Sequence, residues 1–383
     1  MRIVHVITRL IVGGAQENTL LTAAGQVEEF GDDVIVVTGP GAGPEGSLEE
    51  WALQRGLAVR LIPEMGRAIR PWKDWRSYQA IATAIRELSP DIVHTHSSKA
   101  GILGRAAAHR QQVPVVHTIH GAAFHFGQSR LSQAVFRQAE RWAARRCQKL
   151  ISVCDAMTRQ YVNARIATPE MFTTIYSGMD VEPFLDPPRS REEVRAELGF
   201  QDDDIVVGKV ARLFNLKGHR YLLEAASQII EKCPRARFLL VGDGPLRDQF
   251  EARISRDGLA DHFVLAGLVP PGRIPELLHA TDLVVHASVW EGLARVLPQS
   301  MIAGKPVVSF EIDGAPEVVL HEETGLLVQP ESVEGLIESV TRLASDQELR
   351  DRMGNAGCRR WTETFRYQEM ARLVREVYQD VLG

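Results

Sequence analysis

Two cationic side chains follow one predicted strand, at the point where the next helix begins. Arg212 lies just after the β-branched run 205–210, and Lys217-Gly218 opens the following amphipathic segment. The first turn of a helix presents free backbone N–H groups and the positive end of the helix dipole. Two cations beside such a turn are suited to binding a diphosphate; the alternative is a pair of solvated loop charges.

A carboxylate stands before a glycine in the segment 288–299, where the sequence predicts the start of another helix. Glu291 could hold the hydroxyls of a sugar, while the backbone N–H groups of Gly292 and Leu293 face a phosphate. Gln299 follows eight residues after Glu291, about two turns along the same predicted helix and near the same face. One helix would then contact both ends of a sugar nucleotide, with Val296 between them.

Paired glycines follow the first predicted strand. Gly13-Gly14 does not form a GxGxxG pattern, so binding of a nicotinamide dinucleotide is disfavoured. Two glycines that open a helix do let a phosphate approach backbone N–H groups, and a tight turn without a ligand is the alternative. Gly242, in the turn after the run 238–241, has a comparable place in the second half of the chain.

The sequence offers no histidine, cysteine or carboxylate cluster with metal-ligand spacing. His94, His96 and His117 end predicted strands, where a structural role is favoured over catalysis. Asp202-Asp203-Asp204 contains a DxD pattern, which we interpret as a solvated turn. The four cysteines show no paired spacing, and Cys147 and Cys154 are interpreted as small apolar residues, which suits a reducing cytoplasm. We therefore expect no metal and no cofactor.

Alternating strands and helices must position these residues. Short β-branched runs alternate with amphipathic segments, which predicts parallel sheets with crossover helices. Consecutive prolines in the tract 186–190 fit neither a helix interior nor a central strand, so this tract is a predicted linker. The predicted strands are 3–7, 34–38, 59–62, 92–96, 115–119, 150–153, 172–176, 205–210, 238–241, 263–266, 283–286, 307–310 and 325–328.

The predicted fold class is α/β, with two Rossmann-like, doubly wound domains that face each other across a cleft. A chain of 383 residues is too long for one ordinary α/β core and suits two. We place the domains at 1–186 and 190–365, with a C-terminal helix at about 366–383 that packs back onto the first. Ligands of such sheets bind beyond the carboxyl ends of the strands.

Charge and hydropathy restrict the partners. The net charge of −5 argues against an overall electrostatic grip on nucleic acid, and no run approaches the ~18 apolar residues of a membrane span. Two basic segments, 67–76 with Trp72 and Trp75 and 130–149 with Phe136 and Trp142, could contact a membrane surface or an anionic lipid-linked sugar. In the second segment we expect both aromatic rings to pack inward. A cytoplasmic location, with peripheral membrane contact, follows as an expectation.

The segments together resemble the family 4 retaining glycosyltransferases of the GT-B fold, over nearly the whole chain. Each segment is moderately specific, and their order and spacing are much more so. They are GGAQ at 13–16, HTHSSKAGILGR at 94–105, HTIHG at 117–121, SGMD at 177–180, ARLFNLKG at 211–218, VGDGP at 241–245 and the EGL segment at 291–293.

The resemblance implies a role for each matching residue. Arg212 and Lys217 match the cations that bind the donor diphosphate, and Glu291 matches the group that contacts the donor sugar. Gly14 would close over the phosphates, and His120 would lie beside the transferred sugar. The family usually has a second glutamate, which holds the ribose, at the position of Gln299.

The implied reaction transfers a hexosyl or N-acetylhexosaminyl group, with retention, from a nucleoside-diphosphate sugar to a saccharide or lipid-linked saccharide. A UDP-sugar is favoured over a GDP-sugar, and surface polysaccharide or glycolipid synthesis is the favoured setting. The family is thought to use no carboxylate nucleophile, so the protein positions the substrates and stabilises charge. The alternatives are a nucleotide-sugar 2-epimerase and a catalytically weak sugar-nucleotide-binding protein.

Overall fold

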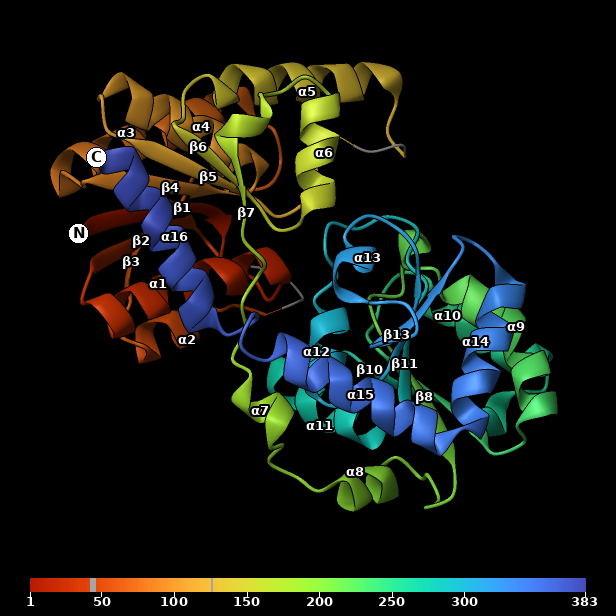
Figure 1. Cartoon of the computed structure of the whole chain (residues 1–383). Helices are drawn as coiled ribbons and strands as arrows, with labels where there is room; N and C mark the ends of the chain where they lie inside the picture. Colours follow the sequence, from red (N-terminus) through yellow and green to blue (C-terminus); the bar gives the residue numbers. More distant parts are fainter. Residues whose placement is uncertain (42–45, 125–126) are drawn as a thin grey trace. The chain divides into compact units, whose positions relative to one another are not determined.

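The computed structural model describes residues 1–41, 46–124 and 127–383, and the chain divides into two compact units (Figure 1). The N-terminal unit comprises Met1–Met179 and Thr364–Gly383, and the C-terminal unit comprises Asp180–Glu363. Each unit has one parallel sheet with crossover helices, so the prediction of two Rossmann-like α/β domains is confirmed. All predicted strands are present, with ends that differ from the expected ones by at most two residues.

A seven-stranded parallel sheet forms the N-terminal unit, in the order β3-β2-β1-β4-β5-β6-β7. Its strands are β1 (Arg2–Arg9), β2 (Asp33–Gly39), β3 (Ala58–Leu61), β4 (Ile92–His96), β5 (Val115–Ile119), β6 (Lys149–Ser152) and β7 (Phe172–Thr174). Its helices are α1 (Gly14–Phe30), α2 (Glu49–Gln54), α3 (Pro71–Leu88), α4 (Ser98–Arg110), α5 (Arg130–Ala144), α6 (Asp155–Asn163), the 3-10 helix η1 (Pro169–Met171) and α16 (Tyr367–Leu382).

The C-terminal unit has a six-stranded parallel sheet in the order β10-β9-β8-β11-β12-β13. Its strands are β8 (Ile205–Val210), β9 (Ala236–Val241), β10 (Phe263–Gly267), β11 (Leu283–His286), β12 (Val307–Phe310) and β13 (Gly325–Val328). Its helices are α7 (Glu182–Leu185), α8 (Arg191–Glu197), η2 (Asn215–Lys217), α9 (His219–Lys232), α10 (Arg247–Arg256), η3 (Ala260–His262), η4 (Pro271–Arg273), α11 (Ile274–Ala280), α12 (Val296–Ile302), α13 (Ala315–Val318), α14 (Val333–Ser345) and α15 (Gln347–Trp361).

The order of strands reverses once in each sheet. In the N-terminal unit the reversal lies between β1 and β4, and in the C-terminal unit it lies between β8 and β11. Two crossover connections leave such a point in opposite directions, so a crevice opens beyond the carboxyl ends of the two strands. The predicted site residues of the C-terminal unit follow β8, β9 and β11, and those of the N-terminal unit follow β1 and β5.

The last helix, α16, packs against α1 in the N-terminal unit (Figure 1). Its buried Tyr378 accepts a hydrogen bond from Gln26 at 3.3 Å, and Arg375 lies 3.1 Å from the buried carboxylate of Asp32. The hydroxyl of Tyr367 donates to Glu28 at 2.6 Å. The helix therefore contributes apolar and polar contacts to the core that contains β1.

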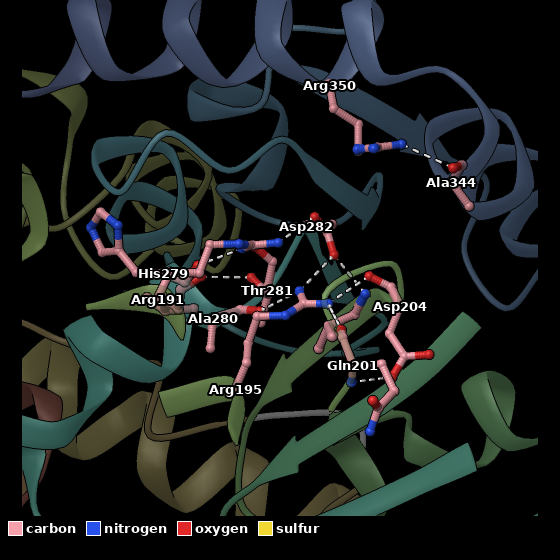
Figure 2. Close-up of polar contacts among 12 residues, drawn as sticks. Arg191, Arg195, Gln201, Asp204, His279, Ala280, Thr281, Asp282, Ala344 and Arg350 are labelled. Atoms are coloured by element: carbon pink, nitrogen blue, oxygen red, sulfur yellow. Dashed lines mark hydrogen bonds and ion pairs between the residues drawn. The ribbon is translucent and has the colours of Figure 1, made fainter. Parts of the chain in front are cut away.

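Two arginines of α8 converge on Asp282, which immediately precedes β11 (Figure 2). Arg191 Nη2 donates to Asp282 Oδ1 at 2.7 Å, and Arg195 Nη1 lies 3.3 Å from Oδ2. The same Oδ2 accepts from the backbone N–H of Val206 at 2.7 Å, and Arg195 donates to the carbonyl of Asp204 at 2.7 Å. These charge-assisted hydrogen bonds fix the segment after the proline tract to the amino ends of β8 and β11.

Candidate active site

The loop after β8 contains both predicted diphosphate-binding cations. Arg212 is exposed, and its guanidinium has no hydrogen-bond or ion-pair partner among the residues that the structure describes. Lys217 ends the short helix η2, and Gly218 then leads into α9. The carbonyl of Leu216 accepts the backbone N–H of Val289 at 2.9 Å, which joins this loop to the loop after β11.

Gly218 makes this junction possible because it adopts a left-handed backbone (φ +65°) in a crowded place. A Cβ atom there would lie 1.6 Å from the carbonyl oxygen of Ala287, in the loop after β11. At Gly242, a Cβ atom would similarly lie 2.2 Å from the carbonyl oxygen of Ala211. Both glycines therefore let neighbouring loops approach at the carboxyl end of the sheet.

We expect Gly218→Ala to destabilise the protein by about 2–4 kcal/mol, because backbone strain and a steric clash add. Gly199 is the matched control, since it has φ +78° but open space around its Cβ position. Gly199→Ala should cost only about 1 kcal/mol from strain. Equal losses in denaturant unfolding of the two variants would show that the close approach at Gly218 is unimportant.

Glu291 lies in the loop after β11 and pairs with Lys217, although 74 residues separate them in the chain. The Nζ of Lys217 donates to Oε1 of Glu291, and the Nε2 of His286 lies 3.6 Å from the same oxygen. The backbone N–H of Glu291 donates to Asp313 Oδ2 at 2.7 Å, which fixes the loop. The sequence predicted a role for each member of the pair but not their contact.

The carboxylate of Glu291 is held in its ionised form. Burial by itself raises the pKa of Glu291, but the neighbouring His286 and the positive charge of Lys217 outweigh it and lower that pKa to about 2. An ammonium group has three N–H donors, so Lys217 can donate to Glu291 and to a phosphate oxygen at once. The pair can therefore contact a sugar hydroxyl and a phosphate that lie next to each other.

The helix after Glu291 begins later than predicted, at Val296. Glu291, Gly292 and Leu293 belong to the preceding loop, so the expectation that Glu291 and Gln299 share one helix is wrong. The physical reason is Pro298, which a helix accepts in its first turn but not in its interior. The side chain of Val296 is buried, and that of Gln299 is half-buried.

Three buried polar side chains near the pair were not predicted to belong to the site. The Nζ of Lys209, both ring nitrogens of His219 and the Oγ of Ser288 have no hydrogen-bond partner within the described part of the chain. Burial, with the nearby charge of Lys217, lowers the pKa of Lys209 to about 7. A lysine inside a predicted strand was the available signal, since lysine is rarely buried.

The predicted site residues of the N-terminal unit follow two of its strands. Gly13 is the N-cap residue of α1, and Gly14 is the first residue of that helix. His120 follows β5, and its Nε2 lies 3.1 Å from Nδ1 of His96, at the end of β4. The structure therefore places His120 next to a strand histidine to which the sequence analysis gave a structural role.

Three strand histidines form a buried cluster that the sequence did not predict. One ring nitrogen from each of His5, His94 and His96 lies within 4.8 Å of the others. His5 is paired with His94 in the β1–β4 register, so residues distant in the chain become neighbours. His117 stands apart, with Nδ1 2.9 Å from Thr95 Oγ1.

This cluster should make stability depend on pH. Burial lowers the pKa of His5 from 6.5 to about 4 and those of His94, His96 and His117 well below 6.5. In the unfolded chain these histidines bind protons at about pH 6.5. Their contribution to the free energy of unfolding is therefore fully present above that pH and is lost as the pH falls toward 4. Each histidine contributes a loss of about 1.4 kcal/mol per pH unit.

Thermal unfolding midpoints should therefore drop steeply from about pH 6.5 to about pH 4.5. The variant His5→Gln should show a shallower drop, because one fewer neutral imidazole is buried. A midpoint that is unchanged across this interval in the native protein would contradict the expectation.

The residues of the DxD pattern make contacts that stabilise the fold. Asp204 Oδ2 accepts the backbone N–H of Gln201 at 2.8 Å, and exposed Asp203 pairs with Arg235. Asp204 is buried, so the expectation of a wholly solvated turn is wrong.

The cysteines are free thiols; Cys147 and Cys154 are buried, and burial raises the pKa of Cys147 to about 11.

The two basic segments expose aromatic side chains. Trp72 and Trp75, at the start of α3, are exposed and stack with ring centroids 5.2 Å apart, next to the exposed Ile69. On α5, Trp142 is exposed and Arg146 lies 3.7 Å over its ring, so the expectation that this tryptophan packs inward is wrong. Among the described residues, no helix has the length and apolar character needed to cross a membrane.

Two family profiles match the chain, one in each unit. The profile described as "Glycosyl transferase 4-like domain" matches residues 13–178, and the profile described as "Glycosyl transferases group 1" matches residues 190–360. The fold is also that of solved structures. Anabaena Alr3699/HepE in complex with UDP-glucose aligns with a TM-score of 0.85 and 23% identity, over 99% of this chain and 100% of that one.

Curated relatives agree with the profiles. The UDP-Gal:alpha-D-GlcNAc-diphosphoundecaprenol alpha-1,3-galactosyltransferase of Escherichia coli is 31% identical over 302 residues, which cover 78% of this chain and 77% of the relative. The 2-deoxystreptamine glucosyltransferase of Streptomyces kanamyceticus is 28% identical over 313 residues, which cover 78% and 79%. The chain therefore belongs to the family 4, group 1 glycosyltransferases of the GT-B fold and is itself a glycosyltransferase.

Proposed function

We propose that the protein transfers a hexosyl or N-acetylhexosaminyl group, with retention, from a UDP-sugar to a saccharide or lipid-linked saccharide. The observation that carries this proposal is the pair of Lys217 and Glu291 at the β8–β11 reversal point. It combines a phosphate-binding cation with an ionised acceptor for sugar hydroxyls. The name of the Escherichia coli relative, which specifies a UDP-sugar and a diphosphoundecaprenol-linked acceptor, supports the substrate classes.

In this proposal, Arg212 and Lys217 bind the diphosphate and stabilise the negative charge that develops as it leaves. Glu291 accepts hydrogen bonds from the donor sugar, with the loop backbone of Gly292 and Leu293 beside it. The leaving phosphate takes the proton of the attacking hydroxyl on the same face of the sugar, which retains the configuration. The protein then acts by positioning and charge stabilisation.

Three further residues contribute to the proposed donor site, together with Gly242 and Val296. Gln299 contacts the ribose; its neutral amide can accept from one hydroxyl and donate to another. Gly14, as the first residue of α1, offers a helix N-terminus to the phosphates. His120 contacts the transferred sugar.

The acceptor and a peripheral membrane contact belong to the same proposal. The exposed Trp72 and Trp75 lie in a segment with Arg67, Arg70 and Lys73, all exposed. Amphipathic aromatic rings beside cations suit the interface of an anionic membrane, where a lipid-linked acceptor would be presented. Binding to vesicles with anionic lipid, lost in Trp72→Ala/Trp75→Ala, would support this contact.

A panel of UDP- and GDP-sugars, each with and without undecaprenyl-diphosphate-linked saccharides, tests the proposed function. Transfer or slow hydrolysis of one UDP-sugar, with an α-linked product from an α-linked donor, is expected. A donor with an altered sugar would indicate epimerisation instead. Binding without turnover, in every donor and acceptor combination, would indicate a sugar-nucleotide-binding protein.

We expect turnover without a divalent ion, because the two cations Arg212 and Lys217 are proposed to neutralise the phosphates. Activity with the selected UDP-sugar should be unchanged after exhaustive treatment with EDTA and gel filtration. Loss of activity that Mg²⁺ or Mn²⁺ restores would contradict this expectation.

A further inference from the structure

A line of hydrogen bonds connects the interior of the N-terminal unit to His120. Gln26 of α1 lies with its Oε1 2.9 Å from Nε2 of His5 in β1. The Nδ1 of His5 lies 2.9 Å from Nε2 of His96 in β4, and the Nδ1 of His96 lies 3.1 Å from Nε2 of His120. Gln26, His5 and His96 are fully buried, so water does not compete for these hydrogen bonds.

The sequence of contacts from Gln26 to His120 determines which nitrogen of each ring carries the proton. A neutral imidazole has one N–H donor and one acceptor nitrogen, whereas an amide oxygen only accepts. Because Gln26 Oε1 accepts, the proton of His5 is on Nε2 and its Nδ1 accepts from Nε2–H of His96. The Nδ1 of His96 then accepts from Nε2–H of His120.

The direction of the chain is set at Gln26, whose amide is oriented by a second partner. Its Nε2 donates to the hydroxyl of Tyr378 in α16 at 3.3 Å. That hydroxyl lies 2.5 Å from Nδ1 of His94, and the Nε2 of His94 lies 2.7 Å from Thr118 Oγ1. The tyrosine hydroxyl therefore accepts from Gln26 and donates to His94, which leaves Gln26 Oε1 for His5.

Burial keeps His5 and His96 in their neutral forms, with one proton on each ring. It lowers the pKa of His5 to about 4 and the pKa of His96 well below its usual range, so both rings are neutral at physiological pH. The ring planes are also close to parallel, with interplanar angles of 14° for His5–His96 and 27° for His96–His120, and hydrogen bonds at both nitrogens fix the orientation of His5 and of His96.

We propose that Gln26, His5 and His96 are positioning residues that hold His120 as its Nε2–H tautomer, with Nδ1 as a hydrogen-bond acceptor for a hydroxyl of the bound sugar. This inference rests on the proposed contact between His120 and the transferred sugar. Within the line, His96 accepts the hydrogen bond that His120 donates through Nε2–H.

A metal ion is the other use that three clustered histidines suggest. His5, His94 and His96 lie close enough, but all six of their ring nitrogens already have hydrogen-bond partners. A metal ion would have to displace three of these hydrogen bonds. The hydrogen-bonded line therefore accounts for the cluster better.

Nuclear magnetic resonance of the full chain with ¹⁵N-labelled histidine tests the tautomers without any ligand. Long-range ¹H–¹⁵N correlations distinguish the two neutral tautomers and the imidazolium, and His120→Gln identifies the signals of His120. We expect Nε2–H for His5, His96 and His120 at about pH 7.5. An Nδ1–H tautomer or an imidazolium at His120 would overturn the proposal, as would one equivalent of Zn²⁺ whose removal shifts these signals.

Kinetics with the UDP-sugar selected in the donor panel tests the consequence. The variant His96→Leu removes the acceptor, and we expect kcat to fall at least tenfold while His120 shows mixed tautomers. In His96→Asn the amide oxygen replaces Nδ1, so kcat should stay within about threefold of the native value. His117→Asn is the matched control: this ring is equally buried in the same sheet but bonds to Thr95, and kcat should not change.

The outcomes separate this inference from the proposed function. Transfer activity with a reversed tautomer at His120 would overturn the positioning line and leave the transferase proposal standing. Full activity in His120→Ala would overturn the role of His120 and with it the purpose of the line. Equal losses of kcat and of thermal stability in all three strand variants would mean that the histidines act only in folding.

Discussion

Glu291→Gln should lower kcat/KM for the preferred UDP-sugar by one to two orders of magnitude. The substitution keeps the shape of the side chain but removes the charge that strengthens its hydrogen bond from Lys217 and its proposed hydrogen bonds from sugar hydroxyls. A hydrogen bond to a charged group contributes about 1.5–3 kcal/mol, which corresponds to roughly 10- to 150-fold in rate. The effect should lie mainly in kcat if the sugar contact strengthens in the transition state.

The control for this variant is Glu311→Gln, at an exposed carboxylate of the same unit. It changes net charge by the same amount, and its kcat/KM should equal that of the native protein. Initial rates over a range of donor concentrations measure both variants. If Glu291→Gln matches the native kcat/KM, Glu291 serves only to hold Lys217.

The pH dependence of the reaction follows from the environment of Glu291. Because its pKa is lowered to about 2, the carboxylate remains ionised throughout the range in which the protein is folded. An acidic limb in the rate profile above about pH 5 would therefore have to arise from another group. The same limb should persist in Glu291→Gln, at a lower overall rate.

The strands were predictable because buried parallel strands are continuous runs of β-branched and apolar residues. The run 205–210 and the run 283–286 are both strands with those same bounds, β8 and β11. The sequence did not predict that β8 and β11 are neighbours. The order of strands depends on the direction in which each crossover helix carries the chain along the sheet. The contact between Lys217 and Glu291 is a consequence of that adjacency.

The histidine cluster shows the same limit in the N-terminal unit. Each of His5, His94 and His96 could be assigned to a strand from the sequence, and their burial follows from that assignment. Their hydrogen bonds depend on the β1–β4 register, which places His5 opposite His94. A slip of one residue would direct these side chains to the other face of the sheet, and no local pattern fixes the register.

The start of α12 could have been predicted better. The segment 288–299 was predicted to contain a helix that carries both Glu291 and Gln299. Pro298 was a stronger signal, since its ring excludes positions beyond the first turn and so requires a start close to Val296. The consequence for function is that Glu291 lies on a loop whose position depends on Asp313 and Lys217.

Lys217→Ala and Arg212→Ala should each weaken binding of UDP and of the intact donor by roughly 10- to 150-fold, because each removes one of the charge-assisted contacts proposed for the diphosphate. Uridine lacks phosphates, so its affinity should not change. Titration calorimetry with uridine, UDP and the donor separates these cases. Arg220→Ala is the matched control, since Arg220 is an exposed cation on α9 that pairs with Glu331. Its affinity for UDP should equal the native value.

The two cations should differ in how they couple to Glu291. Lys217 contacts the carboxylate, whereas Arg212 has no ion-pair partner within the described residues. In a double-mutant cycle on donor binding, Lys217→Ala and Glu291→Gln should therefore be non-additive, while Arg212→Ala and Glu291→Gln should add within about 0.5 kcal/mol. A loss of uridine binding equal to the loss of UDP binding would show that the variants perturb the fold and that the cations do not clamp the diphosphate. Additive effects for the Lys217 and Glu291 pair would show that the two groups act on the donor independently, despite their contact with each other.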